Sequence, residues 1–290
     1  MSVEELATAL AAFAAEKRVD LLGIAPTERF ADVPREHHPL SIFPETRSVV
    51  VLGKRIPRGA LRGVEEGTQF ELYGQYGQSW LVDRMLAITT IALATFLEDH
   101  RWEAVPIQDL PTEVPPSGVA VKPDTPAPNV MVDMRQAAVR AGLGEIGLAG
   151  EVLTPRFGPR QRFQLILTDA PLTPTPLLSE PVCDQCGECL RVCPLGAGSP
   201  DQTVTLTVAG KAMTVASLNL GACRTCRNGA KPNPHHPAGQ PDRLAALCTR
   251  TCVHHLEQTQ RIGNVFAQPF RARPAWQIDG HGRTTLRAEA

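Results

Sequence analysis

The residues with the clearest chemistry in this 290-residue chain are its eight cysteines, all of which lie between Cys183 and Cys252. Half of them form a CxxCxxCxxxCP run, made of Cys183, Cys186, Cys189 and Cys193 followed by Pro194. Three closely spaced thiolates can hold three corners of one iron–sulfur cluster, while the fourth reaches a neighbouring cluster. The spacing therefore predicts electron-transfer chemistry at two metal clusters.

The other half of the cysteines repeats this run in an opened form. Its members are Cys223, Cys226, Cys248 and Cys252. An insertion separates the second from the third, and Val253 replaces the proline. In bacterial ferredoxins the last cysteine of each run binds the other cluster. This crossover predicts two [4Fe–4S] clusters. Cluster one takes Cys183, Cys186, Cys189 and Cys252, and cluster two takes Cys193, Cys223, Cys226 and Cys248.

Other uses of these cysteines remain open. Two zinc sites with four thiolates each would employ the same residues, although zinc gives no reason for the three-ligand run followed by CP. Disulfides are disfavoured because the CxxC spacings are too short to staple a fold. A histidine could replace a cysteine as an iron ligand, but eight cysteines already complete two clusters. We therefore expect surface or supporting positions for His235, His236, His254 and His255.

Charge and composition limit the class of protein. Lys and Arg total 29 against 30 Asp and Glu, for a formal charge of −1, which argues against a nucleic-acid binder. The first residues, MSVEELATALAAFAAEKR, are acidic where a signal peptide would be basic, and no apolar run is expected to reach the length needed to span a bilayer. These observations predict a cytoplasmic protein without a membrane partner, in a compartment where thiols stay reduced.

Helices and strands are expected to alternate before the cysteines. Ser2 and Glu5 form a capping-box pattern ahead of an amphipathic helix. Apolar periodicity predicts further helices over about 80–98 and 135–141, and apolar, β-branched runs predict strands over 21–25, 48–53, 102–107 and 163–168. The proline-rich stretch from Pro111 to Asn129 predicts an irregular loop. This order indicates an α/β (α+β) first domain.

The chain is expected to divide where its composition changes. Pro171, Pro174 and Pro176 indicate a stiff linker, with the boundary near Leu178. We predict a first domain over residues 1–177, a cluster domain over 178–270 and a C-terminal tail over 271–290. The tail after Arg273 is the one segment whose composition allows disorder.

A segment of the first domain indicates what the clusters serve. Neither GxGxxG after a strand nor GxxxxGK[ST] is present, so a classical nucleotide site is not supported. The segment from Ala137 to Leu172 contains AGLGEIG, TPRFGPR and TDAPL, and LLGIAP and FPETRSVVVLG precede it. With the cysteine run, these motifs cover nearly the whole chain. The chain resembles the cobalamin-dependent iron–sulfur reductases, which comprise epoxyqueuosine reductases and corrinoid reductive dehalogenases.

The resemblance implies a fold and a reaction. The first domain would have a nitroreductase-like, cobalamin-binding fold, followed by a bacterial ferredoxin-like 2[4Fe–4S] domain. An external ferredoxin or flavodoxin would reduce the clusters, and these would deliver electrons to a corrinoid that attacks or reduces a small organic substrate. The corrinoid would lie between the first domain and the clusters.

Candidate contacts to such a cofactor surround the AGLG segment. Gly142, Gly144 and Gly147, with Leu143 among them, could let backbone approach a large flat ring, or could form an ordinary helix end and turn. Arg135 and Arg140 could provide a cationic clamp. As proton donors we consider Tyr73 and Tyr76, the only tyrosines, and Asp133. Either tyrosine could instead be structural, and Asp133 could be a helix N-cap.

Departures from the family limit the choice of substrate. Epoxyqueuosine reductases carry an aspartate upstream of AGLG, whereas Pro128 is near that position here, between Asp124 and Asp133. The sequence ends soon after Cys252, without room for the helical repeats that help that enzyme hold transfer RNA, and a twin-arginine signal is missing. We therefore favour a small substrate over transfer RNA.

Two rivals remain besides a transfer RNA reductase. The chain could be a non-catalytic electron-transfer or corrinoid-reactivating protein, which would need no substrate pocket. A nitroreductase-like domain could also bind flavin instead of a corrinoid. The sequence gives neither the substrate nor the oligomeric state.

Overall fold

A computed structural model describes residues 2–108, 117–233 and 240–286. Part of the predicted proline-rich loop, residues 111–116, lies outside these ranges, as do His235 and His236. The helices are α1 Val3–Glu16, α2 Arg62–Glu65, α3 Glu71–Tyr73, α4 Ala87–Asp99, α5 Met134–Arg140, α6 Glu188–Arg191, α7 Leu220–Arg224 and α8 Leu247–Gln258. The strands are β1 Leu21–Pro26, β2 Ser48–Arg55, β3 Ala104–Ile107, β4 Glu145–Ile146, β5 Val152–Leu153, β6 Gln161–Thr168, β7 Thr203–Val208, β8 Lys211–Ala216, β9 Trp276–Ile278 and β10 Thr284–Leu286. Single 3-10 turns add η1 Thr27–Phe30, η2 Arg35–His37, η3 Pro39–Ser41 and η4 Arg58–Leu61.

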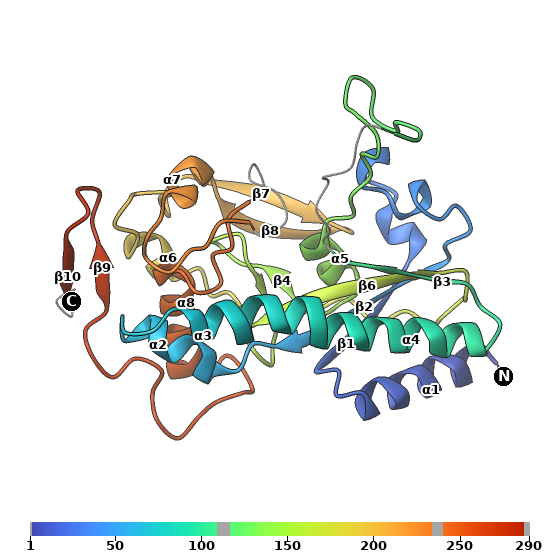
Figure 1. Cartoon of the computed structure of the whole chain (residues 1–290), viewed down its shortest axis with the longest axis horizontal. Coiled ribbons are helices and arrows are strands. Elements are labelled where there is room, and N and C mark those ends of the chain that lie inside the picture. The colour runs from blue at the N-terminus through green and yellow to red at the C-terminus, as the bar shows by residue number, and fades with distance from the viewer. Residues whose placement is uncertain (1, 109–116, 234–239, 287–290) are drawn as a thin grey trace.

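The centre of the fold is a four-stranded sheet with the order β1-β2-β6-β3 (Figure 1). Every pairing in it is antiparallel, and Val50 of β2 lies opposite Ile24 on one side and Ile166 on the other. All four strands were predicted from their apolar, β-branched runs. Antiparallel pairing gives a mixed α/β fold without the parallel crossovers that alternating helices and strands often form.

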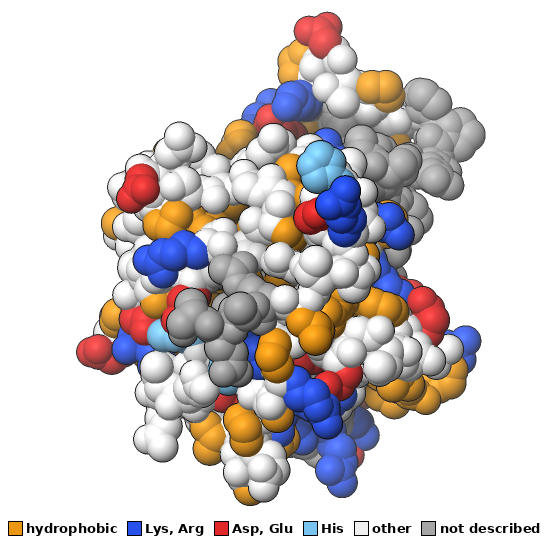
Figure 2. All heavy atoms as spheres, turned by 90° about the vertical axis from the view of Figure 1, so that its left-hand side faces the viewer, with side chains coloured by type: hydrophobic (Ala, Val, Ile, Leu, Met, Phe, Trp, Pro, Cys, Tyr) orange, Lys and Arg blue, Asp and Glu red, His pale blue; other side chains and the backbone are white. Residues whose placement is uncertain are grey.

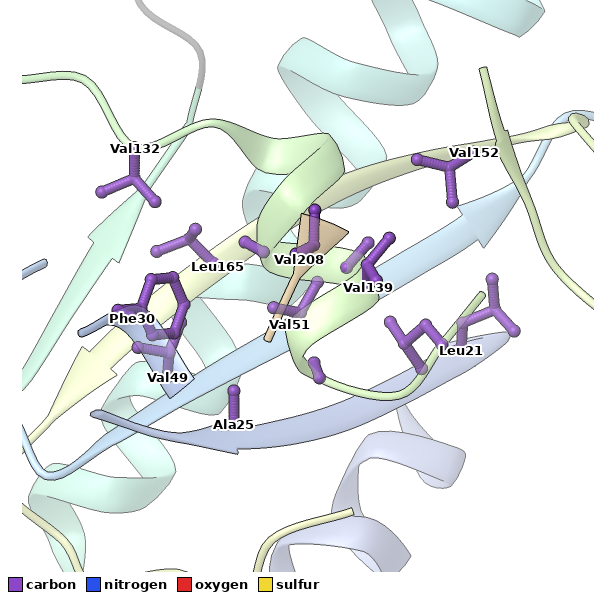
Figure 3. Packing of buried hydrophobic residues seen from close by; sticks show 14 of the residues in the cluster. Leu21, Ala25, Phe30, Val49, Val51, Val132, Val139, Val152, Leu165 and Val208 are labelled. Atoms are coloured by element: carbon purple, nitrogen blue, oxygen red, sulfur yellow. The ribbon is translucent and has the colours of Figure 1, made fainter. Parts of the chain in front are cut away.

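The two faces of the sheet are covered by different helices, as strand alternation requires. Val49, Val51 and Leu165 face α5, and Figure 3 shows this cluster closed by Phe30 and by Val208 of the β7–β8 hairpin. On the opposite face, Val50 and Leu52 pack with α1 and α4. The capping box of α1 is present, with the Ser2 hydroxyl accepting from the Glu5 amide and the Glu5 carboxylate accepting from the Ser2 amide. The amphipathic helix predicted after the capping box is therefore present, and its apolar face packs against the sheet.

The helix predicted over about 80–98 is longer in the structure. A continuous helix runs from Glu71 to Asp99, with π-helical turns at Gly74–Ser79 and Leu81–Leu86 between α3 and α4. By length and composition alone this helix could cross a membrane, and 39% of its apolar window is buried. The expectation that no apolar run reaches this length was wrong on length and composition, since the helix is apolar enough even though it includes Asp83 and Arg84.

Packing crosses the boundary predicted near Leu178, which remains a prediction from composition. The hairpin residues Val208 and Met213 belong to the same apolar cluster as α5 and the sheet. A second cluster joins Tyr73 and Leu81 to Val253, Phe270 and Trp276. The tail considered for disorder contains the β9–β10 hairpin, whose first residue, Trp276, is buried. The cysteine region is therefore packed directly onto the sheet-bearing part.

Candidate metal centre

The first cysteine cavity lies between α6, α8 and the loop that precedes α6. Four thiols line it, from Cys183, Cys186, Cys189 and Cys252. Gly147, Leu148 and Leu153 of the first part of the chain also line this cavity, so the AGLGEIG segment meets the metal centre here. The cavity brings together the quartet that the crossover assigns to cluster one.

The second cavity lies beside the first. It is lined by Cys193, Cys223, Cys226 and Cys248, and Cys189 contributes to the wall that both cavities share. None of the eight cysteines is paired in a disulfide. The four thiols of each predicted quartet therefore lie on the wall of one cavity.

Helix α8 supplies one ligand candidate to each cavity. Cys248 lies on the wall of the second cavity and Cys252, one helical turn later, on the wall of the first. Residues four apart lie on the same face of a helix. This placement explains why Cys248 and Cys252 stay close together in sequence, although an insertion separates them from Cys223 and Cys226.

Burial of the thiols makes their ionisation difficult in the absence of metal. Burial raises the pKa of Cys189 to about 12 and that of Cys248 to about 11, and it also raises the pKa of Cys252 well above its ordinary value. A metal binds thiolate, so it must supply the positive charge that stabilises four deprotonated sulfurs. Two quartets of thiols, with three members whose pKa is raised by burial, fit metal clusters that stabilise thiolate.

A buried carboxylate fixes the start of the cysteine run. Glu145 of AGLGEIG is 4% exposed, and its Oε1 accepts hydrogen bonds from the amides of Val182 at 2.8 Å and Cys183 at 2.7 Å. Its Oε2 lies 3.4 Å from Lys211 Nζ of the β7–β8 hairpin. The sequence interpretation considered the glycines of this segment and missed Glu145, whose signal is an acidic residue in an otherwise apolar and glycine-rich motif.

An ion pair lies where the two cavities adjoin. Arg243 Nη2 is 2.8 Å from Glu151 Oε1, and its Nη1 donates to the carbonyl of Ala149 at 2.9 Å. Arg243 lines the second cavity and Glu151 lines the first, while Ala149 lines both. Neither charged residue was predicted, because 92 positions of sequence separate them and neither belongs to a recognisable motif.

A histidine and two carboxylates flank the first cavity. His255 Nε2 lies 2.7 Å from Asp184 Oδ2, and its Nδ1 lies 3.6 Å from Glu188 Oε1. Ligand atoms of Asp184, Cys186 and His255 all lie within 4.8 Å of one another. Nδ1 of His254 is buried without a hydrogen-bond partner among the described residues. His255 thus stands beside the cluster-one quartet, in the supporting position that the sequence interpretation expected.

The two tyrosines occupy contrasting positions. The Tyr73 hydroxyl is fully buried, lies 2.7 to 2.8 Å from both oxygens of Asp242, and receives a hydrogen bond from Arg162 Nη2 at 2.7 Å. Burial raises the pKa of this phenol well above its ordinary value. Tyr76 is 47% exposed and packs edge-on against Trp80. Tyr73 is therefore enclosed in a buried polar triad, and Tyr76 lies on the outer surface of the helix.

The residues considered as corrinoid contacts are engaged with the protein itself. A Cβ atom at Gly142 would meet the Pro176 carbonyl at 2.1 Å, and at Gly144 it would meet the Leu153 carbonyl at 2.3 Å. At Gly147 a Cβ would meet Leu153 Cδ1 at 2.6 Å, and Leu143 is packed in the core below α5. Close packing of backbone on backbone explains these glycines without a cofactor.

The charged candidates near α5 also have protein partners. Asp133 is the N-cap of this helix, and its Oδ1 accepts from the amides of Arg135 and Gln136. Arg135 donates to Gln240, and the fully buried Arg140 pairs with Asp32 at 2.6 Å. These positions favour the N-cap interpretation of Asp133 and provide no cationic clamp toward the cysteine cavities.

Comparison by sequence gives limited matches. No family model matches the chain. A stretch of 60 residues is 40% identical to the tetrachloroethene reductive dehalogenase of Sulfurospirillum multivorans, covering 20% of this chain and 12% of that enzyme. The corresponding enzyme of Desulfitobacterium hafniense is 40% identical over 68 residues, covering 22% of this chain and 12% of its own. The homology is partial, since the match spans about an eighth of these relatives.

Comparison by structure covers much more of the chain. A catabolic reductive dehalogenase superposes with a TM-score of 0.55 over 99% of this chain and 40% of its own, at 15% identity. A second reductive dehalogenase structure, described in terms of B12-dependent dehalogenation, gives 0.55 at 16% identity, with 99% and 40% coverage. An epoxyqueuosine reductase gives 0.52 at 18% identity, covering 77% of this chain and 57% of its own. The chain thus has the fold of reductive dehalogenases and epoxyqueuosine reductases.

Proposed function

We propose that the chain is an oxidoreductase of the reductive dehalogenase and epoxyqueuosine reductase type, in which a ferredoxin-like cysteine region holds two [4Fe–4S] clusters beside a nitroreductase-like domain. The observation that carries this proposal is the pair of adjoining cavities lined by the eight cysteines, with Cys189 on the wall that both share. The partial homology to tetrachloroethene reductive dehalogenases supports the same reaction class.

The clusters would supply low-potential, one-electron chemistry. The protein's part is to hold and insulate them. Cys189 stands on both cavity walls and keeps the two sites adjacent, and Glu145 fixes the backbone at Cys183. In this proposal a ferredoxin or flavodoxin supplies the electrons and a small organic molecule receives them. The formal charge of −1 supports a small substrate over a nucleic acid, and basic, acidic and apolar side chains are interspersed on the face seen in Figure 2.

A corrinoid is the proposed electron acceptor because one fold relative is described in terms of B12-dependent dehalogenation. Several of the residues predicted to contact it are engaged within the protein. Gly142 and Gly144 are closed by backbone carbonyls, and Arg140 is occupied by Asp32.

The test is anaerobic purification with cobalamin supplied, followed by iron, sulfide, zinc and cobalt analysis and an absorbance spectrum. About eight iron and eight sulfide per chain are expected for two [4Fe–4S] clusters. Zinc in place of iron and sulfide would remove the redox function altogether. Corrinoid absorbance together with cobalt would support a corrinoid as the electron acceptor. Release of a yellow cofactor on denaturation would instead indicate a flavin.

The pairing of ligands has its own test. The crossover predicts that C183A and C252A lose the same cluster, whereas C248A loses the other, although Cys248 and Cys252 share a helix turn. Each variant should retain roughly half of the iron, and the EPR spectrum of the remaining reduced cluster identifies it. Identical spectra from C248A and C252A would contradict the pairing.

One observation favours the alternative of an electron-transfer or corrinoid-reactivating protein. The proposed proton donor Tyr73 is sealed by Asp242 and Arg162, so no substrate reaches its hydroxyl in this conformation. A protein that only passes electrons on would need no such access. Reduction of a partner's corrinoid without turnover of any small halogenated or epoxide compound would establish this alternative.

A further inference from the structure

The ion pair of Glu151 and Arg243 separates its charges between the two cysteine cavities. The guanidinium of Arg243 is 5% exposed and lines the second cavity, and the carboxylate of Glu151 lines the first. The pair is therefore a fixed dipole with its positive end at cluster two.

The other charged residues that line the cavities are distributed in the same sense, with carboxylates at the first cavity. Asp184 and Glu151 line the first cavity together with His255, which is bonded to Asp184. Among the described residues that line the second cavity, only Arg243 carries a charge. The first quartet thus faces two carboxylates, and the second faces a guanidinium.

These charges act differently on the two redox states of a cluster. A cluster held by four thiolates is anionic, and one-electron reduction adds a further negative charge. A nearby cation stabilises the reduced form and raises the reduction potential, and a nearby carboxylate does the reverse. Both charges of the pair are largely shielded from solvent, so their effect is screened less than that of surface charges.

We propose that the Glu151–Arg243 pair orders the two reduction potentials, with cluster two higher than cluster one. This inference rests on the proposed function, because it requires both clusters. One electron from a low-potential carrier protein of the ferredoxin or flavodoxin class would then reside mainly at cluster two. The exchange between the sites moves a single electron, and no bond or proton changes. Arg243 and Glu151 are positioning residues for charge and not ligands.

The experiment is a redox titration of the cluster-loaded protein with dithionite, followed by EPR. C252A and C248A, which are each expected to keep one cluster, assign the two potentials. R243Q should lower the potential of cluster two enough to change the distribution of the electron between the sites at least tenfold, equivalent to 59 mV for a one-electron couple. E151Q should raise the potential of cluster one by more than that of cluster two.

Two matched variants test whether charge is the cause. R243K keeps the positive charge and should retain the wild-type order of potentials. R55Q removes a half-exposed cation at the end of β2, paired with Asp20, and should leave both potentials unchanged. Equal shifts in R243Q and R243K would overturn the inference, because charge would then not be responsible.

The outcomes separate this inference from the proposed function. A wild-type protein without iron and sulfide overturns both. Two clusters with potentials that do not respond to R243Q and E151Q overturn only the ordering. If R243Q loses cluster two, its potential cannot be measured, and E151Q then provides the test. A difference between the two potentials that is the same in E151Q as in the wild type would overturn the ordering.

Discussion

The four-stranded sheet and the cysteine region are stabilised in different ways. In the sheet, Val49 to Leu52 of β2 have no exposed surface, and apolar side chains fill both faces. The cysteine region contains or contacts several charged residues that are less than 10% exposed, namely Glu65, Glu145, Asp242, Arg243 and Arg250. Apolar burial stabilises a fold by itself, whereas buried charges do so only while their partners stay in place. We therefore expect the cysteine region to be more sensitive than the sheet to the loss of any one of its partners.

Removal of iron should give the largest effect and separate the two regions. We expect amide hydrogen exchange to rise by orders of magnitude over residues 183–233 and 240–256 after anaerobic chelation, because the thiols around each cavity no longer share a metal that holds the loops together. The amides of β1, β2 and β6 should stay protected. Equal loss of protection in the sheet would show that the two regions unfold as one unit.

Glu145 tests the link between the regions. E145A removes the acceptor of two buried amides and the partner of Lys211, so we expect a loss of about 3 kcal/mol in the free energy of unfolding of the loaded protein. Iron should be lost from cluster one before cluster two. K211M keeps the amide bonds and should cost about 1 kcal/mol. Denaturant titration with iron release measures both, and equal effects of the two variants would refute the anchoring role.

Tyr73 and Tyr76 form a natural matched pair. Y73F removes the hydroxyl between Asp242 and Arg162 but leaves their 2.5 Å ion pair, so we expect a loss of about 1–2 kcal/mol. Y76F changes an exposed ring and should alter stability by less than about 0.5 kcal/mol. If Tyr73 also donates a proton, Y73F abolishes substrate reduction while dithionite still reduces the clusters. Equal stability of the two variants would contradict the role of the triad.

The smallest effect on stability is expected at Asp32, which belongs to the sheet-bearing part of the chain. A hydrogen bond from Arg140 lowers the pKa of the Asp32 carboxyl below its ordinary 3.8. Its stabilisation is therefore fully present above about pH 4 and is lost as the pH falls through the lowered value. Because Asp32 is 52% exposed, solvent screening limits the effect to less than about 1 kcal/mol.

The measurement is the acid limb of unfolding, which should be shallower in D32N than in the wild type. D99N removes an exposed carboxylate at the end of α4 and serves as the control. An acid limb that is as steep in D32N as in the wild type would show that the Arg140 contact contributes nothing.

The strands and the cysteine quartets were predictable because their signals are local. Runs such as SVVVLG fix β2 directly, and the crossover of a known motif groups eight cysteines without knowledge of the fold. The β7–β8 hairpin was missed, although TVTLTV and KAMTVA alternate around Ala209 and Gly210, both of which have positive φ. That signal was present in the sequence and was overlooked because the segment lies inside the cysteine region.

The buried polar contacts could not be predicted in the same way. Tyr73 and Asp242 are separated by 169 residues, and Arg250 reaches Glu65 across 185. Each pair exists only because the cysteine region folds back onto α2 and α3, and nothing in the neighbouring residues indicates this. The AGLG glycines had two interpretations in the sequence, and in the structure their lack of a side chain allows close packing against Pro176 and Leu153.

Helix α8 places Cys248 and Cys252 on adjoining cavities within a single turn. Each residue added to an α-helix advances it by about 100°. One residue inserted between these cysteines would therefore swing one sulfur away from its quartet while the other stayed in place. The spacing of four residues therefore tolerates no change in length between the two cysteines.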